Sequence, residues 1–162
     1  MTFRYVHRFP CSVDRFWEIF WDPEYDRRLD EAAGTRHTVL REWQEGDIHC
    51  WRTRYEADGQ SKDATRLLGG GFFEYEQEAR LDRKAGRLTW EVFPKLSVGG
   101  SFKAQGSVEV RESGAETERV IEGEVRVGIP IIGAKIEEAV RDRLAKSYEG
   151  DARIVREMLG AS

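Results

Sequence analysis

The chain has 162 residues, of which 40% are hydrophobic and 35% are charged, and its net charge at pH 7 is −4. This length fits one domain with its own core, so we expect residues 1–162 to form a single ligand-binding domain. The 26 basic and 30 acidic residues are interspersed, which excludes the clustered basic surface typical of nucleic-acid-binding proteins. We also expect no stable membrane insertion, because no segment is long and apolar enough to span a bilayer.

The first residues and the two cysteines indicate a cytoplasmic protein. Residues 1–8 alternate apolar and basic side chains and do not resemble the apolar core of a signal peptide. Cys11 and Cys50 lie far apart and follow no spacing typical of a metal or redox site. We predict that both are free thiols in a reducing compartment, with a disulfide between them as the alternative.

The N-terminal segment predicts a strand followed by two short helices. Apolar and aromatic residues occupy alternate positions in 3–9, which is the period of a strand. Ser12 is placed to cap a first helix, whose apolar residues follow at helical spacing. A second helix is predicted to start at Asp22-Pro23 and to end at Gly34.

From Thr35 to Gly128 the apolar residues alternate with polar ones, which predicts about six antiparallel strands with one buried and one solvated face. Gly106 and Gly123 fall on the buried side of neighbouring strands. A glycine there marks either a sharp bend or the close approach of another element. We favour the bend, because a sheet must coil strongly to form a cup.

The C-terminal segment predicts one long helix. Apolar residues recur every three or four positions from Ile132 to Leu159, and charged residues lie between them. A helix from about Gly133 to Leu159 must bury this stripe, and the large apolar surface available to it is the sheet.

The order of these elements resembles the START-like or SRPBCC superfamily, as do Trp17 in the first helix and the Gly-Ile-Pro-Ile-Ile-Gly entry at 128–133. Residues 13–25 and 125–137 are similar to the opening and close of an uncharacterised bacterial START-like family. The resemblance implies an α+β helix-grip fold. In that fold a curved antiparallel sheet of about seven strands carries two short helices after its first strand and a long C-terminal helix on its concave face.

The resemblance also implies a cavity between sheet and helix. In this superfamily such cavities hold apolar molecules, which most members bind, transport or sense and a minority convert. Aromatic side chains that carry one polar atom orient an apolar ligand well, although packing of the core is the alternative role for each of them. We predict that the residues that line the cavity and bind the ligand are His7, Trp51, Tyr55, Phe73, Tyr75, Trp90, Phe102, Ile136 and Val140.

No pattern in the sequence predicts a metal, a cofactor or a catalytic residue. The adjacent pair His49-Cys50 would point to opposite faces of a strand and cannot chelate one ion. Gly69–Gly71 lack the Lys-Ser/Thr and the helix of a phosphate-binding loop, and a lid or hinge is the favoured interpretation. His7 is the best candidate for acid–base chemistry, with a satisfied histidine of the core or of the cavity wall as the favoured alternative.

Three functional hypotheses follow. The first is non-catalytic binding or transport of an apolar small molecule or lipid, by a monomer or weak dimer. The second is an enzyme of the cyclase or hydratase type that uses a cavity histidine or tyrosine as general acid or base. The third is a partner-binding module, which would need an exposed apolar patch, and the sequence shows none outside the buried positions.

Overall fold

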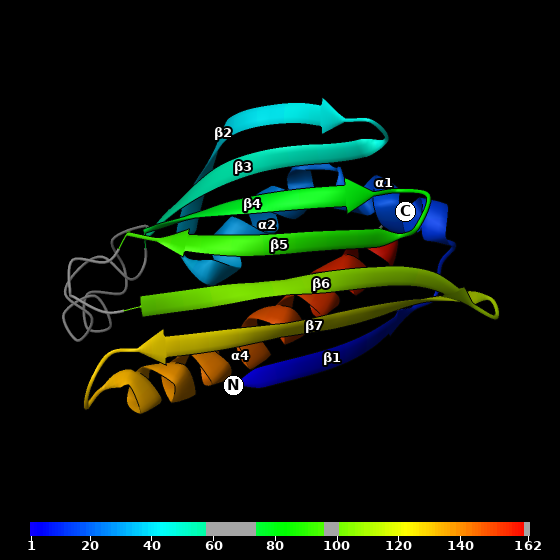
Figure 1. Cartoon of the computed structure of the whole chain (residues 1–162). Helices are drawn as coiled ribbons and strands as arrows, with labels where there is room; N and C mark the ends of the chain where they lie inside the picture. Colours follow the sequence, from blue (N-terminus) through cyan, green and yellow to red (C-terminus); the bar gives the residue numbers. More distant parts are fainter. Residues whose placement is uncertain (58–73, 96–100, 161–162) are drawn as a thin grey trace.

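The computed structural model describes residues 1–57, 74–95 and 101–160, so the predictions for Phe73 and for Gly69–Gly71 lie outside the described residues. In chain order the strands are β1 (Thr2–Phe9), β2 (Thr35–Glu45), β3 (Ile48–Ala57), β4 (Tyr75–Asp82), β5 (Arg87–Pro94), β6 (Ser101–Ser113) and β7 (Glu116–Gly128). The helices are α1 (Val13–Phe20), α2 (Pro23–Ala33) and α4 (Gly133–Gly160). The strands form one 7-stranded antiparallel sheet in the order β1-β7-β6-β5-β4-β3-β2 (Figure 1).

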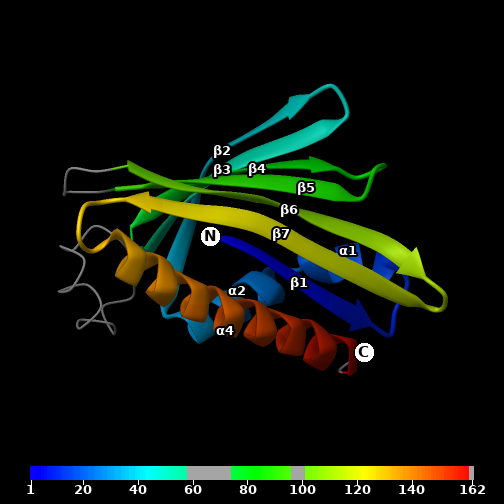
Figure 2. The same cartoon turned by 60° about the horizontal axis from the view of Figure 1, so that its bottom comes forward.

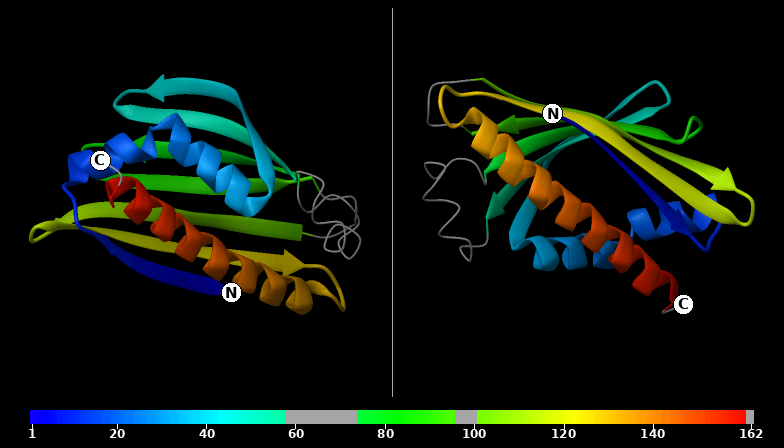
Figure 3. Two further views of the ribbon diagram at one scale, coloured as in Figure 1. Left: turned by 180° about the vertical axis from the view of Figure 1, so that it is seen from behind. Right: turned by 90° about the horizontal axis from the view of Figure 1, so that it is seen from below.

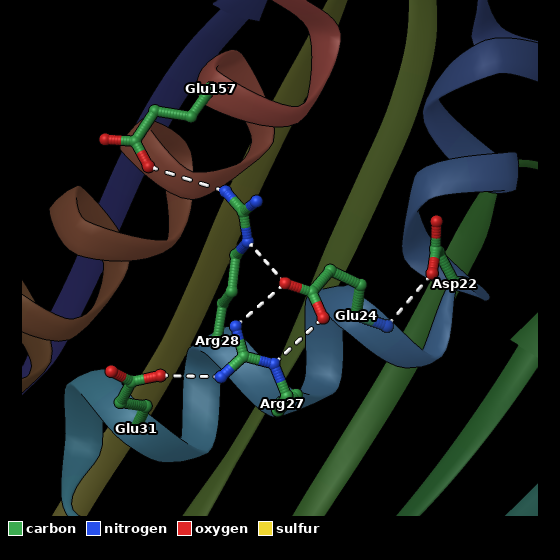
Figure 4. Close-up of polar contacts among 6 residues, drawn as sticks. All are labelled: Asp22, Glu24, Arg27, Arg28, Glu31 and Glu157. Carbon is green, nitrogen blue, oxygen red and sulfur yellow. Dashed lines mark hydrogen bonds and ion pairs between the residues drawn. The ribbon is translucent and has the colours of Figure 1, made fainter. Parts of the chain in front are cut away.

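The predicted caps position α1 and α2 directly after β1. The Ser12 hydroxyl accepts a hydrogen bond from the backbone N–H of Arg15 at 3.1 Å, which satisfies an orphan donor at the start of α1. The Asp22 carboxylate does the same for Glu24 at 2.9 Å in α2 (Figure 4). Gly34 ends α2 with φ +65°, a conformation that favours glycine. The two helices that were predicted after β1 are therefore confirmed.

The sheet curves around α4, with α1 and α2 on the same face (Figures 2 and 3). The long helix packs against β1 and β7 on one side and against α2 on the other. The most buried apolar side chains of its C-terminal half are Ala152 and Val155, each 1% exposed. The predicted fold class, a seven-stranded curved sheet with a long C-terminal helix on its concave face, is confirmed.

An exposed network of ion pairs connects α2 to α4 (Figure 4). Glu24 accepts hydrogen bonds from Arg27 and Arg28, and these bonds lower the pKa of its carboxyl group to about 2. Arg28 also reaches Glu157 of α4 at 3.7 Å. Exposed ion pairs contribute little to the stability of the fold, so the main effect of this network is to orient α2. Burial of the Tyr25 side chain contributes more to stability than these pairs do.

The two glycines of the buried face pair directly with each other across β6 and β7. The ring of Trp90 lies against Gly106 and the ring of Phe3 lies against Gly123, so that an added Cβ at Gly106 would be 2.6 Å from a Trp90 ring carbon. Phe3 and Trp90 are themselves stacked, with ring centroids 6.2 Å apart. The glycines thus permit the close approach of two aromatic rings, which is the alternative that we gave for them, and the bend that we favoured stays a prediction.

Gly106→Ala is expected to lower the free energy of unfolding by about 1–3 kcal/mol, because the new methyl group collides with Trp90 and with the β7 backbone. The matched control is Gly150→Ala in α4, where an added Cβ meets nothing within 4 Å. That control should raise stability by up to about 1 kcal/mol through helix propensity. Urea unfolding of both variants checks the prediction, and equal stability of Gly106→Ala and the unchanged chain would contradict it.

Candidate functional site

A cavity of about 390 Å³ lies between the concave face of the sheet and helices α2 and α4. Apolar side chains from the sheet, from the end of α1 and from both other helices form most of its wall, among them Phe20, Leu29, Ala79, Leu88, Val108 and Leu144. Fewer polar side chains reach it, among them Asp26, Gln77, Arg143, Ser147 and Asp151. An apolar wall with a few polar groups is the usual composition of a small-molecule site.

Most of the residues predicted for the cavity lie on its wall. These are Trp51, Tyr55, Tyr75, Trp90, Phe102 and Val140. Ile136 is not among the lining residues. It is buried one turn before Val140, where α4 approaches β7 so closely that an added Cβ at Gly133 would meet the backbone of Val127.

His7 also lies off the cavity wall, although it occupies the buried side of β1 as predicted. Its Nδ1 lies 3.2 Å from Nη2 of Arg119, which can only donate, so Nδ1 accepts and the ring proton resides on Nε2. Burial and the positive charge of Arg119 lower the pKa of His7 to about 4. The ring is therefore neutral near pH 7 and satisfied within the protein, as in the alternative interpretation that we gave for it.

A buried polar cluster that the sequence did not reveal lies beside the cavity. Its members, called the Asp151 cluster below, are His7, Tyr25, Arg119 and Asp151. Arg119 is 3% exposed and its Nη1 donates to Oδ1 of Asp151 at 2.7 Å. The Tyr25 hydroxyl donates to Oδ2 of the same carboxylate at 2.8 Å. Tyr25 and Asp151 belong to the cavity wall, so the cluster forms a polar end of a mostly apolar space.

A signal for this cluster was present in the sequence. Arg119 shares the buried parity of β7 with Ile121 and Val125, where a charged residue needs a partner. Its partner Asp151 precedes Ala152 in the apolar stripe of α4, 32 residues away. Nothing in the alternation of β7 or the period of α4 specifies that these two positions meet.

Three tyrosines place hydroxyl-bearing rings along the cavity. Tyr55 and Tyr75 are stacked with centroids 5.0 Å apart, and Tyr148 of α4 packs against Tyr5 at 5.4 Å. Burial raises the pKa of Tyr55, Tyr75 and Tyr148, so all three remain protonated and can donate. Within the described part of the chain, none of the three hydroxyls has a hydrogen-bond partner.

A second hollow, about 970 Å³ in volume, lies over the outer face of the sheet. Charged side chains line it, and several of them pair across strands, as Arg4 does with Glu122 at 2.8 Å. It is shallow and solvated, so it does not suit an apolar ligand. Among the residues that the structure describes, no three His, Cys, Asp or Glu side chains come together as a metal site would require. No described helix combines the length and hydropathy needed to cross a membrane.

Residues 4–159 match the model of a family described as a protein of unknown function, DUF2505. The chain belongs to this family. No curated protein matches the DUF2505 chain at a significant level.

Solved structures resemble the DUF2505 chain over nearly their whole length. A protein from Thermus thermophilus is 18% identical with a TM-score of 0.64, and the match covers 100% of this chain and 99% of the other. An aromatase/cyclase from a Streptomyces species is 10% identical with a TM-score of 0.65, covering 98% and 92%. Norcoclaurine synthase from Thalictrum flavum is 13% identical with a TM-score of 0.63, covering 96% and 86%. These likenesses confirm the START-like or SRPBCC fold.

The depressed pKa of His7 makes the stability of the protein depend on pH. Above pH 6.5 the ring is neutral in both the folded and the unfolded chain. As the pH falls from 6.5 to about 4, the unfolded chain binds a proton that the folded chain does not, so the free energy of unfolding decreases. Allowing for partial exposure of the ring, we expect this loss to amount to about 2 kcal/mol.

His7→Gln should lessen that loss, because glutamine can accept from Arg119 but does not titrate. Urea unfolding of both proteins at several pH values between 7 and 4 measures the difference, and carboxylates that titrate in the same range cancel in the comparison. Parallel stability curves for the two proteins would show that His7 is not the group responsible.

Proposed function

We propose that this protein binds or transports an apolar small molecule or lipid in the cavity between its sheet and α4, without converting it. The observation that carries the proposal is the composition of that cavity, whose wall combines aromatic and aliphatic side chains from five strands and three helices with few polar groups. Trp51, Tyr55, Tyr75, Trp90, Phe102 and Val140 are the proposed ligand contacts.

The volume of the cavity restricts the ligand. At about 390 Å³ it lies near the lower end of the range for small-molecule sites, roughly 300–1,000 Å³. A fused-ring molecule or a single acyl chain fits such a space, whereas a two-chain phospholipid exceeds it. We therefore propose a ligand of modest size that is enclosed on most sides by rings.

The proposal treats the chain as one ligand-binding domain that acts in the cytoplasm as a monomer or weak dimer. The match of one family model to residues 4–159 supports the single domain. Two buried free thiols, Cys11 and Cys50, support a reducing compartment.

A cyclase- or hydratase-type enzyme is the second candidate. It is favoured by the protonated tyrosines of the cavity wall, which are placed to act as general acids. Two structures of similar fold are named as an aromatase/cyclase and a synthase. His7 does not support the enzyme hypothesis, because its Nδ1 accepts a hydrogen bond from Arg119 and the residue lies off the cavity wall. Incubation of the ligand extracted with the protein should leave its mass unchanged if binding alone is the function.

Filling the cavity should abolish binding of an apolar probe. Val140→Trp places an indole in the cavity, and we expect it to weaken binding of N-phenyl-1-naphthylamine at least about tenfold, because the space for the probe is lost. Fluorescence titration of the probe measures this. The matched control is Ala139→Trp, which adds the same ring to an exposed position of α4.

The control should bind the probe as the unchanged chain does. Native mass spectrometry of the protein from its own host gives a second measurement, with a small-molecule adduct expected for the unchanged chain and lost in Val140→Trp. If the unchanged chain neither carries an adduct nor binds the probe, the cavity is not a ligand site and the proposal is wrong.

A further inference from the structure

We infer that Asp151 and Tyr148 form a subsite for a hydroxyl group, and that the ligand is an uncharged apolar molecule bearing an alcohol or phenol. The inference rests on the proposed function and specifies the chemical class of the ligand. It assigns a ligand-binding role to the Asp151 cluster, in addition to its contacts between β7, α2 and α4. Its basis is the arrangement of donors and acceptors at one end of the cavity.

Both residues of the subsite face the cavity from the same helix. Tyr148 and Asp151 are three residues apart in α4, so their side chains lie on one face of the helix, and both line the cavity. Neighbouring elements hold them in place. The Tyr148 ring packs against Phe3 and Tyr5 of β1, with centroids 6.3 and 5.4 Å away.

The carboxylate of Asp151 retains capacity to accept. Each of its oxygens receives one hydrogen bond from a described side chain, from Arg119 at 2.7 Å and from Tyr25 at 2.8 Å. An ionised carboxylate offers about four acceptor positions, so two remain for a donor that enters the cavity. Because both partners are anchored in other elements, the carboxylate is held rigidly and a ligand hydroxyl would cost Asp151 little freedom on binding.

Tyr148 supplies the complementary donor. Its hydroxyl contacts no hydrogen-bonding partner among the described residues, and it is not one of the polar atoms sealed inside the core. It is thus accessible from the cavity. A ligand oxygen there accepts from Tyr148 while its own proton is donated to Asp151, which is the paired donor and acceptor function of a hydroxyl group.

The charge of the cluster selects against anions. Arg119 already forms its ion pair with Asp151, its Nη2 donates to His7 and its Nε is sealed inside the core. The other cation of the wall, Arg143, lies eight residues before Asp151 in α4, roughly 12 Å along the helix. Neither is therefore placed to neutralise a ligand carboxylate beside Asp151. A fatty acid that entered with its carboxylate foremost would meet the carboxylate of Asp151 in a space of low dielectric constant. An ether could accept from Tyr148 but would have nothing to donate. A neutral hydroxyl fits best.

Three naphthalenes of one shape test the inference, namely 2-naphthol, 2-methoxynaphthalene and 2-naphthoate. Each is titrated at pH 7 against the full chain that carries N-phenyl-1-naphthylamine, and displacement of that probe gives its affinity. We expect 2-naphthol to bind about 5- to 10-fold more tightly than 2-methoxynaphthalene, because it forms one additional buried hydrogen bond. We expect 2-naphthoate to bind most weakly of the three.

Tyr148→Phe should weaken binding of 2-naphthol about 3- to 10-fold while the probe itself still binds, so that displacement remains measurable. Tyr5→Phe is the matched control, because it removes a hydroxyl from the ring that packs on Tyr148 and lies outside the cavity wall. The control should keep the preference for 2-naphthol. Thermal unfolding of both variants ensures that they are compared as folded proteins.

The outcomes separate the two proposals. Equal affinity of the unchanged chain for the three naphthalenes, or tighter binding of 2-naphthoate, overturns the hydroxyl subsite and leaves the cavity as a ligand site. A preference for 2-naphthol that survives Tyr148→Phe overturns it as well. If N-phenyl-1-naphthylamine itself does not bind the unchanged chain, the proposed function fails.

Discussion

The buried ion pair between Arg119 and Asp151 is the interaction on which the arrangement of sheet, helix and cavity depends. A guanidinium group that is 3% exposed requires a partner, since an unpaired charge in the interior costs several kcal/mol. Its partner lies on α4, and Tyr25 of α2 bonds to the same carboxylate. One carboxylate therefore fixes both helices over β7. The space between helix and sheet beyond this point is left open, and it is the cavity.

The floor of the cavity depends on a different constraint, the absence of side chains at Gly106 and Gly123. Because these positions carry no Cβ, the rings of Trp90 and Phe3 can lie close to the backbone of β6 and β7. A Cβ at either position would lie too close to the ring beside it, so the rings would have to move. The glycines thus set the packing of these rings on the sheet, and the ion pair connects α4 to the same sheet.

Local patterns in the sequence predicted the elements well and their meeting points poorly. Alternation and helical spacing identified the strands and α4, and Ser12, Asp22 and Gly34 marked the ends of α1 and α2, because these signals depend on neighbours in the chain. His7 and Ile136 were assigned to the cavity on parity and on the helical stripe alone. Parity gives the face of an element but not the distance to the opposite wall, which at Ile136 is set by the contact of Gly133 with Val127. The Asp151 cluster was missed for the same reason.

The protonation states of the cluster connect stability with the kind of ligand that the cavity accepts. Near pH 7 the positive Arg119 and the negative Asp151 balance each other, and His7 and the tyrosines are neutral, so the polar end of the cavity carries no net charge. A neutral site in an apolar wall offers hydrogen bonds without attracting ions. Protonation of His7 would place a second cation 3.2 Å from Arg119, and the repulsion would act on the buried ion pair between β7 and α4. Holding His7 neutral therefore preserves both the ion pair and the uncharged character of the cavity end.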